Sequence, residues 1–209
     1  MTVNINHQST MDAPRAAVAT LLIFVAIAFM PAFIGTAFPP DAWYEGLAKP
    51  LWNPPPWLFG PVWSVLYTLI GYAGYLAWSS SVANQRYAAF GIYAIHLLLN
   101  ALWTPLFFGY HSPGWALVSI IAQWLAIALN IVAFYRIKPA AGLLLAPVLL
   151  WVTFALLLNT LIWTLNRYCD QSRQTSSTPN FLESDRRFPL IDFVALHRDN
   201  KPLYSSQQQ

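Results

Sequence analysis

The chain has 209 residues, of which 57% are hydrophobic and 9% are charged, whereas a soluble domain carries roughly 25% charged residues. The few charges bound long gaps, each able to hold the roughly 20 apolar residues that a bilayer-spanning helix needs, and this excludes a soluble protein. The net charge of +3 comes from single bases beside these gaps, so the sequence offers no basic patch to a nucleic-acid partner.

The first hydrophobic segment covers residues 16–38 and follows a short N-terminal arm, residues 1–15. It is longer than the apolar core of a signal peptide, which has about 7–15 residues, and no A-x-A-like cleavage site follows it. We therefore predict that this segment is a first membrane helix.

Residues 39–56 form the only connection long enough to have a structure of its own. Its sequence "LAKPLWNPPP" is rich in proline, which fixes φ and biases the preceding residue away from the helix. The loop is therefore predicted to be stiff, and a stiff loop loses little entropy when it closes over a ligand.

Four further hydrophobic segments follow, at about residues 57–78, 87–108, 115–135 and 141–165. They are continuous apolar runs without the ten-residue alternation of a membrane barrel, so we expect helices. Short connections make consecutive helices antiparallel neighbours. The predicted fold is an all-α membrane protein, a five-transmembrane-helix bundle over residues 16–167 with a Pro/Trp-rich loop between helices one and two.

Residues 168–209 begin with a polar stretch and end in serine and glutamine, so we predict a disordered tail. Within it, "FPLIDFVALH" is more apolar, which leaves open a contact with the membrane surface or with a partner. The single cysteine, Cys169, has no internal disulfide partner.

Lysine and arginine are distributed unequally between the two ends of the predicted helices. Four lie on the N-terminal side and two on the other, which predicts a cytoplasmic N-terminus if this integral multi-pass protein lies in a bacterial cell envelope, the location that we favour. The four are Arg15, Arg86, Arg136 and Lys138, and the two are Lys49 and Arg167.

The predicted spans contain no Asp, Glu, Lys or Arg, which argues against a proton-coupled pump or a voltage sensor. The sequence also lacks the filter sequence or acidic ring of a cation channel. A Walker loop, a nucleophile elbow and a Cys/His cluster at metal spacing are absent as well. We therefore predict no catalytic residues, no metal site and no cofactor.

Aromatic and amide side chains line one face of each of three predicted helices. One interpretation is structural, because asparagines hydrogen-bond between membrane helices and indoles fill space. The other is a slot for a flat apolar ligand, with a gap where Gly71 and Gly74 lack side chains. The faces comprise Trp63, Tyr67 and Gly74 in the second span, His96, Asn100, Trp103 and Phe107 in the third, and Trp151, Ala155, Asn159 and Trp163 in the fifth.

Other tryptophans and the histidines have simpler explanations. Trp57 and Trp78 lie at the two ends of the second span, where tryptophan anchors a helix at the membrane interface, and Trp115 fits the same role. His111 lies in a short loop and is expected to be solvated. His96, alone at membrane depth, is expected to be a structural group, with axial haem ligation as the alternative.

Four stretches occur in chain order: "WYEGLAKPLWNPPPWLFGPVWSVLY", "LLLNALWTPLFFG", "GWALV" and "LLLAPVLLWVTFALLLN". Together they resemble the translocator protein family, also called the tryptophan-rich sensory protein or peripheral benzodiazepine receptor family. The resemblance implies a five-helix membrane bundle, often dimeric, with a ligand cavity open toward the loop after helix one. It also implies ligands of the kinds that the family binds, namely porphyrins, cholesterol-like lipids and benzodiazepine-type compounds.

The resemblance further implies a pocket whose residues come from the loop and from helices two, three and five. A small residue at position 155 matters there, because a larger side chain would intrude on the ligand. Tyr67 joins the set because it shares a helix face with Trp63. The predicted ligand-binding residues are Tyr44, Trp63, Tyr67, Asn100, Trp103, Thr104, Phe107, Trp151 and Ala155, and the predicted lid is formed by Trp52, Asn53, Pro54 and Pro55.

The chain departs from the family pattern in helix five. Members that bind cholesterol carry an aromatic residue after the Leu-Asn pair and a nearby arginine, whereas Thr160 and Leu161 follow that pair here. Cholesterol is therefore a doubtful partner. Ala122 and Ala126 in helix four offer a small-xxx-small motif for a possible homodimer.

These observations lead us to expect a membrane receptor or carrier for tetrapyrroles such as porphyrins and haem precursors, with a regulatory, stress or transport role. The indoles and Tyr44 would grip the flat ring, and Asn100 would make a directional hydrogen bond. One alternative is a light- or oxygen-dependent porphyrin-degrading enzyme, since indoles donate electrons to photoexcited porphyrin, although no acid–base pair is evident. Others are a cholesterol or lipid transport protein and a membrane adaptor that uses its tail.

Overall fold

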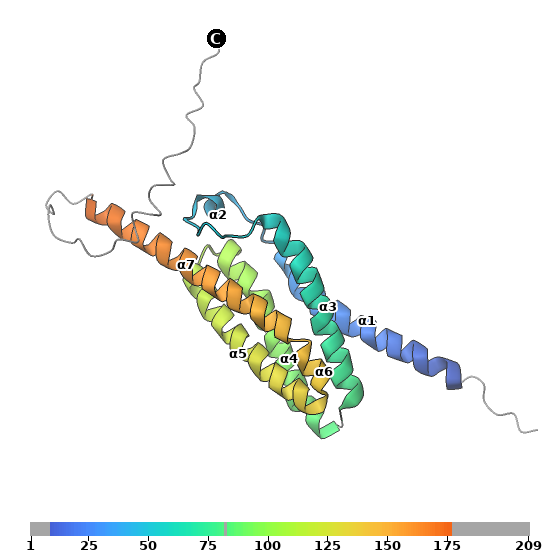
Figure 1. Ribbon diagram of the computed structural model, residues 1–209. Helices are drawn as coiled ribbons and strands as arrows, with labels where there is room; N and C mark the ends of the chain where they lie inside the picture. Colours follow the sequence, from blue (N-terminus) through green and yellow to red (C-terminus); the bar gives the residue numbers. More distant parts are fainter. Residues whose placement is uncertain (1–8, 82, 177–209) are drawn as a thin grey trace, which may run out of the picture. The chain divides into compact units, whose positions relative to one another are not determined.

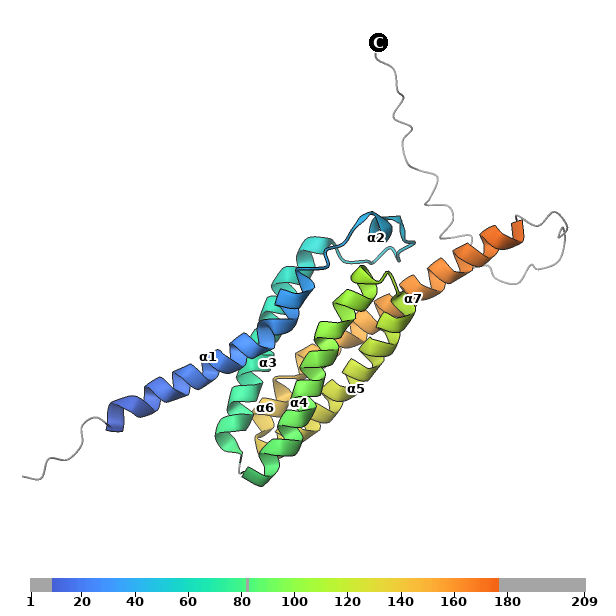
Figure 2. The ribbon, with the colours of Figure 1, turned by 180° about the vertical axis from the view of Figure 1, so that it is seen from behind.

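The structure is a computed structural model that describes residues 9–81 and 83–176, and every regular element in this part of the chain is a helix. The residues up to Cys169 form one compact unit, in which α1 packs along α3 and α4 along α5 (Figure 1, Figure 2). The long helices are α1 (Ser9–Gly35), α3 (Pro56–Ser80), α4 (Ala83–Thr104), α5 (Pro113–Ile137) and α7 (Ala146–Ser176), and the short ones are α2 (Ala42–Gly46), the π-helix η1 (Pro105–Gly109) and α6 (Pro139–Leu143).

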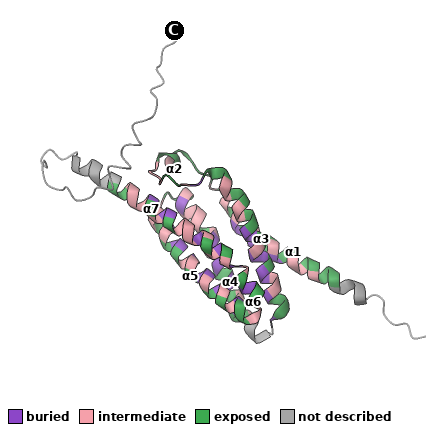
Figure 3. Cartoon of the chain, viewed as in Figure 1, coloured by how far each residue is buried: buried purple, intermediate pink, exposed green. Residues whose placement is uncertain are grey.

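Four stretches of these helices are long and apolar enough to cross a membrane: Pro14–Gly35, Arg86–Gly109, Pro113–Ile137 and Pro139–Tyr168. Many large apolar side chains on the outward faces are exposed, as expected of surfaces that face lipid (Figure 3). These findings confirm an all-α integral membrane protein. The predicted second span, which became α3, is not among the four because its tryptophans, tyrosines, prolines and glycines lower the mean hydropathy.

Two glycines let α1 and α3 approach closely. A Cβ atom on Gly71 would lie 2.6 Å from the Cα of Val25, and one on Gly74 would lie 2.8 Å from the ring of Phe24. The interpretation of these glycines as part of a ligand slot is therefore wrong, because α1 fills the space that their missing side chains leave. They are packing positions, as small residues in membrane helices commonly are.

Two of the predicted spans are interrupted where a proline removes a backbone donor. After Thr104 the chain enters η1, in which the N–H of Tyr110 donates to the carbonyl of Pro105 at 2.8 Å. The predicted fifth span is also two helices, because α6 ends before α7 begins, and Pro147 lies in the first turn of α7. The prolines thus mark breaks within segments that hydropathy alone joins.

The ends of the described chain are more helical than expected. α1 begins at Ser9, within the predicted arm, and residues 1–8 lie outside the described residues. α7 continues to Ser176, so the expectation of disorder is wrong for residues 168–176, where arginine and glutamine favour extension of an existing helix. The remainder of the predicted tail, residues 177–209, lies outside the described residues.

The motif predicted for a homodimer is not available on the surface. Ala126 is buried within its own chain, while Ala122 is half-buried. A second copy could not reach Ala126, because the helices of the same bundle already cover it.

Candidate functional site

The short helix α2 places Tyr44 at the edge of the bundle. Asp41 caps this helix, and its Oδ1 accepts a hydrogen bond from the Tyr44 N–H at 3.1 Å. This bond, followed by the attraction of His111, holds the pKa of the Asp41 carboxyl below its ordinary value. The ring of Tyr44 then packs edge-on against Phe107 and Phe108, with centroids 6.1 and 5.2 Å apart.

Trp103 connects this aromatic group to α7. Its ring stacks on Phe107 with centroids 5.0 Å apart, and its indole N–H donates to Oδ1 of Asn159 at 3.0 Å. Asn159 in turn donates to the carbonyl of Pro113 at 2.9 Å. Asn159 therefore positions Trp103. The predicted site did not include Asn159, although its position on the same helix face as Trp151 could have indicated it.

A second group lies between α3 and α4. Trp63 stacks on Tyr67 with centroids 5.1 Å apart, and the hydroxyl of Tyr67 donates to Oδ1 of Asn100 at 2.9 Å. Tyr67 and Asn100 are both buried. The carbonyl of Asn100 is thus occupied by a neighbour, which leaves its amide N–H groups as the part that could bond a ligand.

A third group lies beneath the loop. Trp151 packs against Phe59 and Phe154, with ring centroids 6.0 and 5.4 Å apart, and Trp52 of the loop reaches Phe154 at 5.5 Å. The indole nitrogen of Trp151 is buried and has no hydrogen-bond partner within the described residues. The side-chain oxygen Oδ1 of Asn53 is also buried without a hydrogen-bond partner within the described residues. An indole N–H rarely stays unpaired when buried, so this group has an unused donor.

The loop is fastened to the bundle at two points. At one, the Asn166 side chain accepts from the Ala48 N–H at 3.0 Å and donates to the Ala48 carbonyl at 3.1 Å. At the other, Nε2 of His111 lies 3.0 Å from Oδ2 of Asp41, and its ring stacks on Trp43 at 4.3 Å. Asp41 thus gives the His111 ring a hydrogen-bond partner, although 41% of the histidine side chain is exposed.

Lys49 lies beside Tyr44. Its Nζ lies 4.4 Å from the centre of the Tyr44 ring and donates to the carbonyls of Glu45 and Leu47. Desolvation lowers the pKa of Lys49 below its ordinary value, although the charge of Glu45 opposes this.

Other predicted residues lie apart from the aromatic groups. Thr104 faces α1, where a Cβ on Gly35 would meet its side chain at 3.7 Å. Ala155 is half-buried and packs against the main core. His96 is fully buried, with the ring of Tyr93 edge-on at 6.4 Å. Within the described residues, no group of three His, Cys, Asp or Glu could hold a metal ion.

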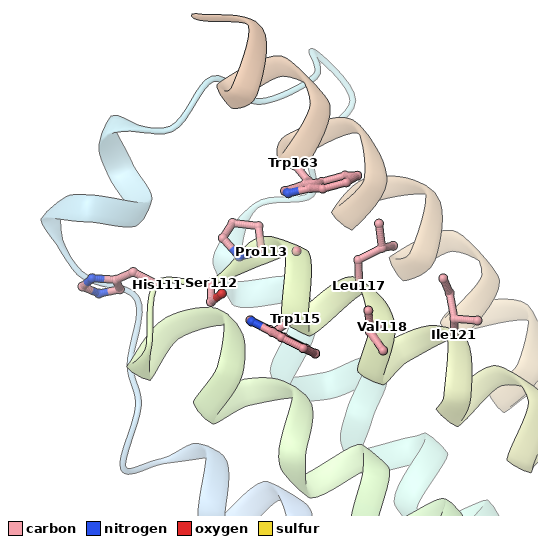
Figure 4. Close-up of a pocket in the computed structure, with 9 residues that line it drawn as sticks. His111, Ser112, Pro113, Trp115, Leu117, Val118, Ile121 and Trp163 are labelled. Carbon is pink, nitrogen blue, oxygen red and sulfur yellow. The ribbon is translucent and has the colours of Figure 1, made fainter. Parts of the chain in front are cut away.

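A surface hollow of about 500 Å³ lies outside the predicted site, along the start of α5 (Figure 4). Its lining includes His111 and Trp163 but none of the predicted ligand-binding residues. Most of the predicted ligand-binding residues thus lie in groups of packed aromatic side chains, whereas this hollow opens at the surface of the bundle.

Comparison with known proteins identifies the family of this chain. Residues 18–164 match the TspO/MBR family. The chain is 42% identical over 126 residues to the translocator protein of Homo sapiens, covering 59% of this chain and 75% of that protein. It is 44% identical over 149 residues to the tryptophan-rich protein TspO of Archaeoglobus fulgidus, covering 71% and 95% of the two chains. It is 38% identical over 148 residues to the tryptophan-rich sensory protein of Cereibacter sphaeroides, covering 71% and 92%. The aromatic residues beneath the loop lie within the matched segment, and the chain belongs to the TspO/MBR family.

Proposed function

We propose that this protein is a membrane receptor or carrier that binds a tetrapyrrole beneath the loop between α1 and α3. The observation that carries the proposal is the buried, unpaired indole N–H of Trp151. The ring of Trp151 packs against Phe59 and Phe154, and the loop residue Trp52 packs against Phe154. Aromatic walls suit a flat, mostly apolar ring, and an acidic side group of a porphyrin would supply the acceptor that Trp151 lacks.

The membrane arrangement belongs to the same proposal. α3 has 25 residues, about 37 Å of helix, and it packs along α1, which is itself long and apolar enough to span. We count α3 as the fifth span for this reason. Lys49 and Arg167 then lie on the loop side, and the N-terminus lies on the cytoplasmic side of a bacterial cell envelope.

The loop acts as the lid of this pocket. Its two fastening points, at Ala48 and at Asp41, lie on either side of the segment that carries Tyr44. Entry of a ligand requires at least one of them to open. Because prolines already restrict the loop, closure over the ligand costs little conformational entropy.

The test replaces Trp151 by Phe, which keeps an aromatic ring and removes the N–H. Titration of the purified protein with protoporphyrin IX, followed by the porphyrin absorbance, should give a dissociation constant about tenfold higher, equal to about 1.4 kcal/mol. Trp78→Phe, at the opposite end of α3, is the matched control and should bind like the wild type.

Equal binding by both variants would contradict the proposed pocket. The same samples distinguish the enzyme alternative, since they can be illuminated. A loss of porphyrin absorbance that is faster with protein than in protein-free detergent would favour a degrading enzyme over a receptor or carrier.

A further inference from the structure

The surface hollow along α5 has one polar end and one apolar end. Its lining begins with His111 and Ser112 in the loop before α5 and continues to Ile121, about 12 Å further along the helix from Pro113 (Figure 4). Trp163 reaches over from α7 and forms the second wall. We propose that this hollow binds one anionic phospholipid, with the headgroup phosphate at the loop end and an acyl chain along α5.

The apolar end presents a surface for an acyl chain. Leu117, Val118 and Ile121 follow one another along one face of α5, and the exposed fraction of Val118 is 56%. Since α5 is long and apolar enough to span a membrane, this face meets lipid and not water. The hollow gives one lipid chain two walls in place of one, which increases its dispersion contacts.

The loop end presents hydrogen-bond donors. A Cβ atom on Gly114 would lie 2.9 Å from the indole nitrogen of Trp163, so only glycine lets that indole reach the first turn of α5. The indole nitrogens of Trp163 and Trp115 point toward the end of the hollow where Ser112 lies (Figure 4). Ser112 makes no side-chain cap to α5, so its hydroxyl is not used within the helix. Together these groups match the oxygens of a phosphate.

The charge at this end selects an anion. The Arg167 guanidinium carbon lies 4.8 Å from the centre of the ring of Trp163, the residue that forms the second wall of the hollow. Nε2 of His111 is already paired with Oδ2 of Asp41. Among the side chains that the structure describes, no carboxylate pairs with Arg167. Arg167 is therefore the group that favours an anionic headgroup over a zwitterionic one.

The same chemistry argues against other occupants. A sterol offers a neutral hydroxyl and would leave the charge of Arg167 without a counterion. A second copy of the chain would have to insert a protruding anionic side chain into the membrane face, and the described helices carry no Asp or Glu on their spans.

The experiment measures lipid retention by native mass spectrometry of the full-length protein in mild detergent. Phosphatidylglycerol, phosphatidylcholine with the same acyl chains, and cholesterol are offered at equal concentrations. We expect one bound phosphatidylglycerol, retained about fivefold more than phosphatidylcholine, from one arginine near the membrane surface. Equal retention of the two phospholipids, or preferential retention of cholesterol, would overturn the proposal.

Two matched pairs of variants locate the site. Val118→Trp fills the hollow, whereas Val132→Trp makes the same change on the same helix at a residue that is 49% exposed but outside it. Arg167→Gln removes the selecting charge, whereas Arg136→Gln removes a cation near the far end of α5. Only V118W should lose the bound lipid, and only R167Q should lose the preference for phosphatidylglycerol.

The proposal does not depend on tetrapyrrole binding. V118W should bind protoporphyrin IX like the wild type, because the hollow contains none of the pocket residues, and this result also shows that the variant is folded. A loss of lipid in V132W equal to that in V118W would contradict the assignment of the site.

Discussion

The two ends of α3 show how one helix serves two kinds of packing. Around Gly71 and Gly74 it lies so close to α1 that a single added carbon would collide with backbone or ring atoms. Toward its N-terminus the packing is aromatic, with Phe59 against Trp151 of α7 and Trp63 stacked on Tyr67 of α3 itself. The close end has no spare space and fixes the bundle, whereas the aromatic end contains an unpaired donor and bears the proposed pocket.

The largest effect should come from disturbing the close end. Gly71→Ala places a Cβ 2.6 Å from the Val25 Cα, which no side-chain rotation relieves, so we expect the free energy of unfolding to fall by about 3 kcal/mol. Gly91→Ala is the control, because nothing lies within 4 Å of the added atom, and it should stabilise by about 0.5–1 kcal/mol. Denaturant unfolding in detergent, followed by circular dichroism, measures both. Similar losses in the two variants would mean that helix propensity, not close packing, governs these glycines.

At the aromatic end, Asn159 is the most sensitive residue. Asn159→Leu leaves the Trp103 N–H without its partner and removes the bond to the Pro113 carbonyl, so we expect a loss of about 2 kcal/mol in the free energy of unfolding and weaker porphyrin binding. Thr160→Val is the matched control, since the Thr160 hydroxyl bonds only to Leu156 in its own helix. If both variants behaved alike in the unfolding and absorbance measurements, Asn159 would not position Trp103.

A change at the contact between the loop and α7 should alter the rate of porphyrin release more than the free energy of unfolding. Asn166→Ala removes both hydrogen bonds to Ala48, and we expect porphyrin release to become about tenfold faster, equal to about 1.4 kcal/mol. Stopped-flow transfer of porphyrin to an acceptor protein measures the rate. Thr164→Val is the control, because Thr164 lies two residues before Asn166 and its hydroxyl bonds only to carbonyls within α7. This variant should release porphyrin at the wild-type rate. An unchanged rate in N166A would show that this end of the loop does not control release.

The smallest effect should be the response of the lid to acid. The pKa of the Asp41 carboxyl is lower than its ordinary value of 3.8, chiefly through the bond from Tyr44. A carboxyl whose pKa is lowered in the closed state stabilises that state above its ordinary pKa, and the contribution disappears as the pH falls through the lowered value. Release should therefore accelerate only in strong acid. Asp41→Asn should abolish this acceleration, and Glu45→Gln, on the same short helix, should preserve it.

The sequence was sufficient for the helical class and for much of the aromatic set, because charge-free apolar runs and repeated indoles are visible without coordinates. Hydropathy joined segments that Pro105 and Pro147 divide, since it does not weigh a missing backbone donor. It also could not tell an open gap from a filled one at Gly71, because the neighbour that fills it belongs to another helix. The bonds between Ala48 and Asn166 join residues that are far apart in the chain, and no local sequence pattern predicts such a pair.

The pairing of Asn166 with Ala48 has a consequence for how the loop opens. One planar amide both accepts from the Ala48 N–H and donates to the Ala48 carbonyl, so a single rotation of that side chain breaks both bonds together. A state in which only one of the two bonds is broken is therefore expected to be rare. This end of the loop therefore has two states, bonded and released, and in the proposed pocket the rate of ligand release at this end would depend on how often this amide rotates.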